Sequence, residues 1–362
     1  MTEDEFYGFV NSIKPLDLFA CENARKYQAN LAMPPGSLGM LQELAVQLAG
    51  ITGSIKNTVE KKRIIVLCAD NGVAQEGVAS APQSVTASQA VNMTEYKTGM
   101  SAIAKKFGCE VQVVDVGIKC DYSCDKILNK KIRRSTNNIS KAPAMSREEC
   151  LAALATGIEL AKKAKDDGVQ ILGTGEMGIG NTTTSTAVLC ALTNEDPVKI
   201  TGRGGGITDQ AFVKKKKVIR MALDINKPNP SDVLDVIAKV GGFDIAAMCG
   251  VFLGAAQCIL PVVIDGYISM VSALCAKRIS SVSAGYFIPS HKSKERGFLL
   301  AAEEVGVKPF LDLNMRLGEG SGCPLAFEII RAACVIMNDM ASFTGAGIDD
   351  SYLTEIRKQR DF

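Results

Sequence analysis

Apolar runs that end in Asp, Asn or Gly recur along the chain and define its expected strands. Residues 64–69 form a continuous apolar run of the kind found in parallel sheets, and Asp70-Asn71-Gly72 follows it. Similar runs predict strands at 110–116, 169–173, 261–266 and 284–291. Apolar residues at helical spacing predict helices at 38–48, 147–167, 241–260 and 325–340. The same spacing predicts a helix that begins at residue 84 or 86, one that follows 261–266 and ends at about 279, and one that begins at 293 or 294. This alternation predicts a doubly wound, Rossmann-like α/β fold, with a mostly parallel sheet and helices on both faces.

The stretch 311–322, Leu-Asp-Leu-Asn-Met-Arg-Leu-Gly-Glu-Gly-Ser-Gly, combines an alternating apolar pattern with a Gly-rich end. The alternation over 311–317 predicts a buried strand, and Glu319 follows it between two glycines. Glycines let a ligand approach the backbone closely, and α/β enzymes place catalytic bases at strand ends. Glu319 is therefore a candidate general base, although a surface Glu in a flexible turn is an equally good interpretation of this stretch alone.

A second Gly-rich turn, residues 173–185, joins an expected strand to an expected helix. Backbone N–H groups, hydroxyls and the positive end of a helix converge there, which favours an anion and most simply a phosphate. The turn matches neither the Walker loop nor the GxGxxG fingerprint, so a dehydrogenase is not indicated. A third Gly-rich loop, 202–206, precedes the lysine run 214–217; one of these lysines could bind the same phosphate while the others are solvated.

The two terminal segments of the chain are expected to form a small lobe separate from the α/β domain. Residues 1–31 have an amphipathic helical pattern broken at Pro15, and Ser37 is a candidate cap for the next helix. We expect a small helical lobe from residues 1–60 with 325–362, and a large α/β catalytic domain from 61–324. The basic segment 119–145 is expected to be an exposed excursion, and the small residues of 241–260 predict a helix that packs closely against a neighbour.

Composition narrows the class of protein. The 362 residues carry a net charge of +2, with no Trp and 6% aromatics, which argues against nucleic-acid or membrane-surface binding. The 12 cysteines include no CxxC pair, so we expect a reduced, cytoplasmic protein without structural zinc. The acidic start is unlike a signal peptide, and polar residues interrupt the apolar segment 244–276, which therefore predicts buried elements and no membrane span.

The available side chains limit the chemistry. His291 is the one histidine of the sequence, so a multi-His metal site is excluded, and no GxSxG elbow supports a Ser-His-Asp hydrolase. Glu176 and Glu319 each lie in a Gly-rich turn, and two glutamates converging on one pocket could hold a proton near neutral pH. The residues alone therefore predict an enzyme that binds a phosphate-bearing substrate on Gly-rich loops and moves a proton with Glu.

Taken together, these motifs resemble the nicotinate-nucleotide–dimethylbenzimidazole phosphoribosyltransferase family, in the family's order and over about residues 34–330. The segments that carry the resemblance are 34–39, 69–73, 76–78, 175–183, 202–206, 241–248, 265–266, 290–295 and 311–322. The resemblance implies transfer of 5-phosphoribose from nicotinate mononucleotide to an aromatic lower-ligand base, giving α-ribazole 5'-phosphate and nicotinate for cobamide assembly. It also implies a Rossmann-like domain, a homodimer, and no metal or organic cofactor.

The resemblance also implies roles for individual residues. Glu319 matches the general base and Glu176 a second active-site carboxylate. Phosphate and ribose are expected at Gly178, Gly180, Asn181, Thr182, Gly204, Gly205, Gly206 and Lys215. The base is expected at Ala81, Gln89, Met177, Leu317, Ser290 and His291.

Three departures from the family pattern leave the base open. Asn71 stands where the family usually has His, Gly205 where Thr is common, and Ala81 where Ser or Tyr is frequent near the base. Relatives that attach purines or phenolics, some of them heteromers, remain alternatives. A further alternative is a non-catalytic subunit that completes the site of a paralogue.

Overall fold

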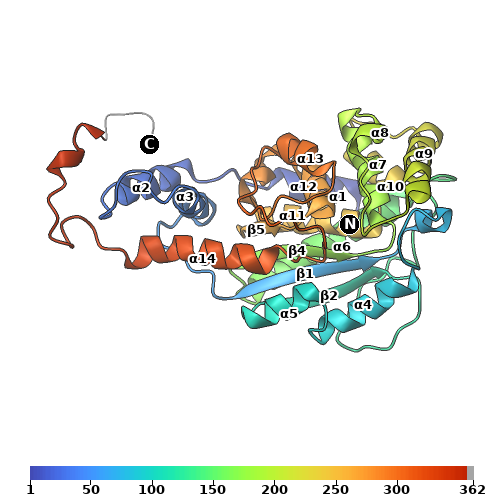
Figure 1. Ribbon diagram of the computed structural model, residues 1–362, viewed down its shortest axis with the longest axis horizontal. Coiled ribbons are helices and arrows are strands. Elements are labelled where there is room, and N and C mark those ends of the chain that lie inside the picture. Colours follow the sequence, from blue (N-terminus) through green and yellow to red (C-terminus); the bar gives the residue numbers. More distant parts are fainter. Residues whose placement is uncertain (357–362) are drawn as a thin grey trace.

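The computed structural model describes residues 1–356 of the chain, and its centre is one six-stranded sheet (Figure 1). The strands are β1 (Lys62–Ala69), β2 (Glu110–Gly117), β3 (Leu128–Asn129), β4 (Ile171–Met177), β5 (Val262–Ile264) and β6 (Phe287–Pro289). Their order is β3-β2-β1-β4-β5-β6, and all neighbouring pairs are parallel. This is the strand order of a Rossmann fold, so the predicted fold class is confirmed.

Helices connect the strands in sequence. The α-helices of the first half are α1 (Glu3–Asn11), α2 (Leu18–Gln28), α3 (Met40–Thr52), α4 (Ser84–Thr94), α5 (Gly99–Lys106), α6 (Arg147–Asp166) and α7 (Asn181–Thr193). Those of the second half are α8 (Pro197–Ile200), α9 (Asp209–Asn226), α10 (Val233–Val240), α11 (Phe243–Gln257), α12 (Tyr267–Ile279), α13 (Phe298–Val305) and α14 (Cys323–Asp339). Short 3₁₀ helices are η1 (Gly72–Glu76), η2 (Ser281–Tyr286) and η3 (Ser351–Leu353).

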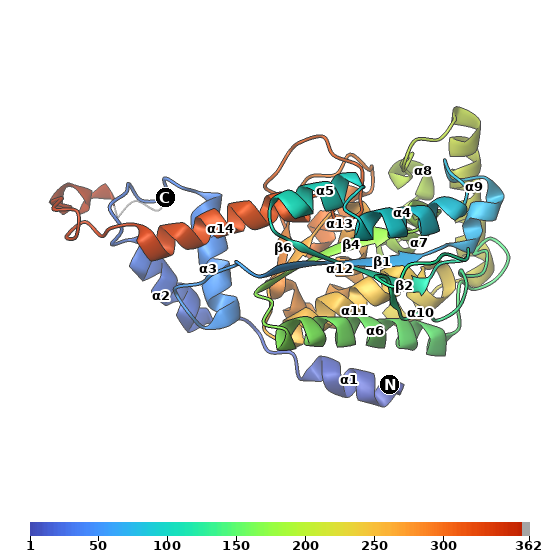
Figure 2. The same ribbon diagram turned by 90° about the horizontal axis from the view of Figure 1, so that it is seen from below.

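Both faces of the sheet are covered, as Figure 2 shows: α4 and α5 lie on one side of the strands, and α6 and α11 on the other. The central strand β1 is buried along its whole length, and its side chains alternate between two apolar cores. Ile65 and Leu67 belong to the core that includes α6 and α11, whereas Ile64 and Val66 belong to the core that includes α14. A strand buried on both faces explains why its sequence is a continuous apolar run.

The helices α6 and α11 touch along their backbones. A Cβ on Gly157 of α6 would lie 1.9 Å from the carbonyl oxygen of Ala247, and one on Gly250 of α11 would lie 2.1 Å from that of Leu154. No side chain fits in either place. The close packing predicted from the small residues of 241–260 is therefore confirmed.

The terminal helices fall into two groups. The helices α2, α3 and α14 pack together and extend to one side of the sheet (Figure 1). By contrast, α1 lies against α6, where Phe6 and Val10 are buried (Figure 2). The division into a lobe of residues 1–60 with 325–362 and a domain of 61–324 stays a prediction, although α1, which belongs to the first of these ranges, packs against α6 of the domain. Residues 357–362 of that lobe lie outside the described part of the chain.

The segment 311–317 is not a buried strand, so this prediction is wrong. It contacts the sheet edge through a bridge between Leu311 and His291, and then leaves it. Asn314 has a φ of +57°, which turns the chain out of the extended conformation. Leu313 and Leu317 are 54% and 55% exposed, so the apolar alternation does not reflect burial against a neighbouring layer.

Several expected boundaries and environments also differ. The strand β4 continues to Met177, so residues 174–177 belong to the strand and not to the turn. Much of 135–145 is buried, because its backbone bonds to Gly117, Asp70 and Lys239, so 119–145 is not simply an exposed excursion. At 284–291 only β6 is extended, after the 3₁₀ helix η2, and α13 begins four or five residues later than expected, at Phe298.

The helix α3 begins without a side-chain cap. Its N-cap is Gly39, which has a φ of +48° and therefore a backbone geometry that few other residues adopt. The prediction that Ser37 caps this helix is wrong. Among residues 1–356, no helix is both long and apolar enough to span a membrane.

Candidate active site

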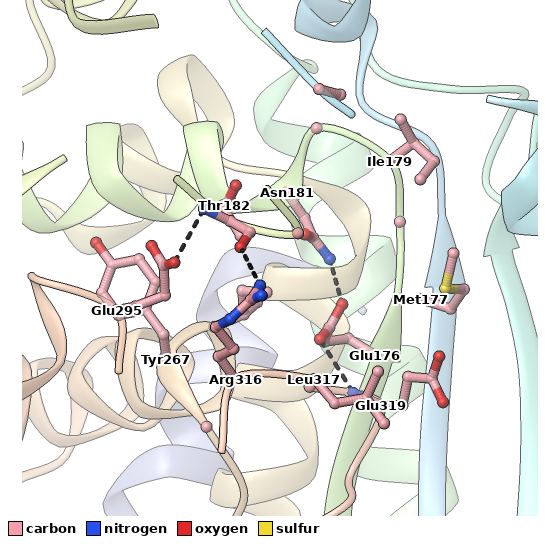
Figure 3. A pocket seen from close by; sticks show the side chains of 18 of the residues that line it. Glu176, Met177, Ile179, Asn181, Thr182, Tyr267, Glu295, Arg316, Leu317 and Glu319 are labelled. Atoms are coloured by element: carbon pink, nitrogen blue, oxygen red, sulfur yellow. Dashed lines mark hydrogen bonds between the residues drawn. The ribbon is translucent and has the colours of Figure 1, made fainter. Parts of the chain in front are cut away.

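A pocket lies at the carboxyl ends of β4 and β5, where ligands bind in open α/β sheets (Figure 3). Its wall comes from segments far apart in sequence. These are 78–80, 176–182, 203–205 with Ile207, 265–269, Ser293 with Glu295, and 316–319. The pocket therefore brings together all three Gly-rich segments that the sequence singled out.

Glu319 lies in a tight turn just before α14. Gly318, Glu319 and Gly320 have φ values of 80°, 65° and 92°, a left-handed run that glycines allow and that strains Glu319. The side chain is only 6% exposed, so the alternative of a solvated surface Glu is wrong. Its Oε2 has no hydrogen-bond partner among the described residues, while Gln89 Nε2 lies 3.5 Å from Oε1.

Burial raises the pKa of the Glu319 carboxyl, and the hydroxyl of Thr98 and the amide of Gln89 partly offset this rise. The carboxylate also has an oxygen free to accept a proton inside the pocket. These are the properties of a general base.

Glu176 lies beside Glu319, near the end of β4 (Figure 3). Its Oε1 accepts the backbone N–H of Glu319 at 3.3 Å, and its Oε2 accepts from the Asn181 amide. Burial, reinforced by the charge of Asp244, raises the pKa of Glu176 to about 8. At neutral pH Glu176 therefore holds a proton, whereas Glu319 is the glutamate whose Oε2 has no hydrogen-bond partner among the described residues.

A buried polar layer lies beneath the Gly-rich turn. Burial raises the pKa of Asp244, at the start of α11, to about 6. A Cβ on Gly178 would meet Asp244 Oδ2 at 2.9 Å and Asn71 Nδ2 at 3.3 Å, so both side chains lie directly behind that turn. Asp70 instead accepts hydrogen bonds from Thr86 Oγ1 and the Lys119 N–H. Neither Asp70 nor Asn71, both candidates from their strand-end position, lines the pocket.

The turn into α7 forms the end of the pocket that suits a phosphate group. Gly180 has a φ of +100° and precedes the helix, and its carbonyl accepts the N–H groups of Thr183 and Thr184. The N-terminus of α7 carries the positive end of the helix dipole. Lys215 is 1% exposed, and its Nζ donates to Thr182 Oγ1 at 2.8 Å. Burial lowers the pKa of Lys215 to about 8, and the nearby charge of Glu295 offsets part of this fall. Because this buried ammonium makes no direct ion pair among residues 1–356, it favours an anion beside Thr182.

The loop 202–206 closes one side of the pocket near Thr182, and hydrogen bonds from two distant segments hold the loop in place. Glu295 Oε1 accepts the N–H of Gly204 at 2.9 Å, and Arg316 donates to the carbonyl of Gly204 at 3.4 Å (Figure 3). Gly204 and Gly205 line the pocket, whereas Gly206 does not. Sequence reasoning gave no role to Glu295 or Arg316, although both lie in segments that carry the family resemblance.

The residues expected to contact the base are only partly brought together. Met177 and Leu317 line the pocket, and Gln89 reaches Glu319. Ser290 and His291 are fully buried behind Asp265, where Ser290 Oγ donates to the Asp265 carbonyl at 3.1 Å and lies 3.2 Å from His291 Nδ1. Ala81 is half-buried in the loop before α4 and does not line the pocket.

An all-parallel sheet with two buried glutamates, a buried lysine and a helix N-terminus at its carboxyl edge defines an α/β enzyme for anionic substrates. The family model described as Phosphoribosyltransferase matches residues 13–348. The chain belongs to the nicotinate-nucleotide–dimethylbenzimidazole phosphoribosyltransferase family.

Individual relatives with this name match the chain over nearly their whole length. The nicotinate-nucleotide–dimethylbenzimidazole phosphoribosyltransferase of Clostridium tetani is 48% identical over 351 residues, covering 97% of both chains. That of Ruminiclostridium cellulolyticum is 49% identical, over 95% of this chain and 98% of the relative. The crystal structure of CobT from Thermus thermophilus superposes with a TM-score of 0.88 at 34% identity, covering 92% of this chain and 99% of that one.

Proposed function

We propose that this protein transfers 5-phosphoribose from nicotinate mononucleotide to a lower-ligand base such as 5,6-dimethylbenzimidazole, forming α-ribazole 5'-phosphate and nicotinate. One observation carries the proposal: Glu319, whose buried Oε2 has no hydrogen-bond partner among residues 1–356, lines the same pocket as Thr182, which contacts the buried Lys215. A base and a phosphate site thus share one cavity. No metal or organic cofactor is part of the proposal.

The phosphate would bind at the turn into α7. Lys215 supplies a positive charge and Thr182 a hydroxyl, while Gly178, Gly180 and Asn181 present the backbone of the turn. Gly204 and Gly205 border the same space from the opposite side, next to Gly206 in their loop. A bound anion would offset the burial of Lys215 and raise its pKa back toward its ordinary value.

The transfer itself would be a single displacement. One ring nitrogen of the incoming base attacks C1 of the ribose, while Glu319 takes the proton from the other ring nitrogen. The glycosidic bond to nicotinate breaks, and its electron pair leaves with the pyridine nitrogen. Attack from the face opposite the leaving group inverts C1 and gives the α-riboside. Glu176, neutral at pH 7, holds the Glu319 backbone without adding a second negative charge.

The identity of the base rests on the other wall of the pocket. Met177 and Leu317 offer apolar contact, and Gln89 an amide near Glu319. Ala81, Ser290 and His291 could act on the base only through neighbours, since none of them lines the pocket. A purine or a phenolic acceptor therefore remains the second candidate, as does a role in a heteromer.

Replacing Glu319 with Gln tests the proposal, because the amide keeps the shape but cannot take a proton. Turnover should fall by roughly 10²–10⁴, while calorimetry should show nucleotide binding close to that of the unmodified protein. Glu303→Gln, a change at an exposed position on α13, is the matched control and should leave turnover unchanged. Near-normal turnover in Glu319→Gln would remove Glu319 from the mechanism.

We further propose a cytoplasmic homodimer without a nucleic-acid partner. The twelve free thiols suit a reducing compartment, and the net charge of +2 gives no general affinity for nucleic acid. Leu18 and Phe19 on α2 are 77% and 70% exposed, an apolar pair that a second subunit could cover. Sedimentation equilibrium should give twice the mass of the chain.

A further inference from the structure

Asp265 is a buried carboxylate to which the mechanism above gives no role. It directly follows β5 and is 2% exposed. Its Oδ2 accepts the backbone N–H of Gly320 at 3.0 Å, and its Oδ1 accepts that of Gly322 at 2.7 Å. Both oxygens are therefore bonded to the turn that carries Glu319.

The Glu319 turn needs such support. Three consecutive residues have left-handed φ values, and Glu319 is not a glycine, so this backbone persists only where its surroundings hold it. The strand β4 packs directly against this turn, because a Cβ on Gly175 would lie 2.4 Å from the Glu319 carbonyl oxygen. The N–H groups of Glu319, Gly320 and Gly322 all donate to carboxyl groups, one on β4 and one just after β5.

Asp265 is itself held in place from the sheet. Its N–H donates to Ser269 Oγ at 3.1 Å, and that hydroxyl lies 2.6 Å from Thr174 Oγ1 on β4. On its other side His291 Nδ1 lies 3.7 Å from Oδ1. Of the charged or titratable groups around Asp265, Glu319 lies in the turn itself, Glu176 contacts that turn from β4, and His291 lies two residues beyond β6.

We propose that Asp265 is a positioning residue for the general base: it clamps the 318–322 turn to the sheet so that the Glu319 carboxylate keeps its place in the pocket. This inference rests on the proposed function of Glu319. Reacting groups must be aligned closely, and a displacement of about 1 Å can cost roughly 10²-fold in rate. A loosened turn would therefore slow the proton transfer and leave the phosphate site at α7 unaffected.

The direct test is Asp265→Asn. The new amide turns an NH₂ toward one of two N–H donors, so one hydrogen bond is lost at nearly constant volume. We expect kcat to fall by roughly 10- to 100-fold, with KM for nicotinate mononucleotide changed less than about 3-fold. Removing the negative charge should also lower the pKa of Glu319 and move the acid limb of the kcat/KM profile to lower pH.

Asp115→Asn is the matched control. Asp115 is also fully buried just before a turn, and its Oδ1 accepts the N–H groups of Gly117 and Ile118 at 3.0 and 2.8 Å. It does not line the pocket. If a buried strand-end Asp matters for folding alone, both variants should lose stability alike, with kcat and the acid limb unmoved in both.

A milder variant covers the case in which Asp265→Asn does not fold. Ser269→Ala removes the hydroxyl that accepts the Asp265 N–H, at a helical position where Ala is favourable. We expect kcat to fall roughly 3- to 10-fold with KM for the nucleotide unchanged. A folded Asp265→Asn or Ser269→Ala enzyme with normal kcat and an unmoved acid limb overturns the proposal. If Glu319→Gln is inactive in the same assay, that result leaves the proposed function standing; if Glu319→Gln is active, the function itself is in error.

Discussion

Burial decides which of several similar residues can act, and Lys215 is the clearest case. It belongs to a run of four lysines, of which Lys214 and Lys217 are exposed. Lys215 alone is directed into the protein, toward Thr182, and burial lowers its pKa to about 8. The lysine run by itself predicted only that one of its members would matter, since the choice depends on the helical phase of α9 against its neighbours; the family resemblance is what pointed to Lys215.

Lys215→Met should weaken nucleotide binding without unfolding the protein, because it removes a buried charge and keeps the length of the side chain. The loss of a charged hydrogen bond, about 1.5–3 kcal/mol, corresponds to a KM for nicotinate mononucleotide raised roughly 10- to 100-fold. Lys217→Met, at an exposed position of the same helix, is the control and should leave KM unchanged. Equal KM values in both variants would contradict a phosphate site at Lys215.

The pKa of Lys215 also predicts a pH dependence of binding. The ammonium form is present below about pH 8 and is lost above it, so affinity for the nucleotide should weaken as pH rises through about 8. Calorimetric titration at several pH values would measure this. The Lys215→Met variant should show no such dependence, and a persisting one would assign it to another group.

The raised pKa of Glu176 predicts that the stability of the fold decreases as pH rises. Its pKa rises from an ordinary value of 4.5 to about 8 in the fold. Between these values the unfolded chain releases a proton that the folded chain keeps, so the free energy of unfolding falls as pH rises through this window. Glu176→Gln removes that loss, provided the Asn181 amide turns its oxygen to the new NH₂.

The Tm of Glu176→Gln should therefore match the unmodified protein near pH 5 and exceed it at pH 8 by at least ~2 °C, or roughly 1 kcal/mol. Thermal unfolding across this pH range measures the difference. The exposed Glu303→Gln serves as control, and its Tm should run parallel to the unmodified protein. A constant difference for Glu176→Gln would mean that the carboxyl is already ionised in the fold.

At the scale of elements, apolar patterns predicted the central strand and the helices that cover it well, and the segments beyond the last strand poorly. Strand β1 and helices α6 and α11 follow directly from their apolar spacing, because each is buried by layers that the pattern itself implies. The segment 311–317 alternates apolar and polar residues but lies beyond the last strand, and Leu313 and Leu317 stay exposed there. Periodicity records which residues are apolar, whereas burial depends on what the rest of the chain places against them.

The candidate site shows the same limit. Glu176, Glu319 and the turn at 178–182 were predicted because glycines around a polar residue are a local signal. The roles of Glu295, Arg316 and Asp265 depend on hydrogen bonds to loops distant in sequence, so no local pattern could reveal them. Ser290 and His291 end a strand yet face away from the pocket, since β6 turns them behind Asp265.

The contact between α6 and α11 gives the element-scale prediction. Gly157→Ala places a methyl 1.9 Å from the Ala247 carbonyl oxygen, so the helices must separate. The free energy of unfolding should fall by about 1–3 kcal/mol or more. Gly8→Ala on α1, where a Cβ meets nothing within 4 Å, is the matched control and should be neutral or stabilising. Denaturant unfolding of both variants measures the contrast, and equal midpoints would contradict the close packing.

At the scale of the whole molecule, a near-neutral chain concentrates cations beside its pocket. A second hollow shares Arg203, Gly204 and Arg316 with the first. Within it the ring of Phe212 is approached by Lys216, Arg203 and Arg296 at 4.2, 4.6 and 5.8 Å. Two acidic groups lie at this cationic rim: Asp209 pairs with Arg203, and Glu295 accepts the Gly204 N–H.

The cationic rim should attract an anionic nucleotide and ignore a neutral base. We expect kcat/KM for nicotinate mononucleotide to fall roughly 3- to 10-fold between about 20 and about 300 mM salt, because the added ions screen the rim. The value for 5,6-dimethylbenzimidazole, measured at saturating nucleotide, should stay constant and is the internal control. Equal salt dependence for both substrates would exclude electrostatic attraction by the rim.

The most direct test of the central claim is product analysis of the purified chain alone. It would be incubated with nicotinate mononucleotide and, separately, 5,6-dimethylbenzimidazole, other benzimidazoles, adenine and phenols. We predict equimolar nicotinate and a new α-riboside phosphate with at least one of these bases, and no product from Glu319→Gln. Absence of nicotinate release with every base would contradict the account and leave this chain as the partner of a catalytic paralogue.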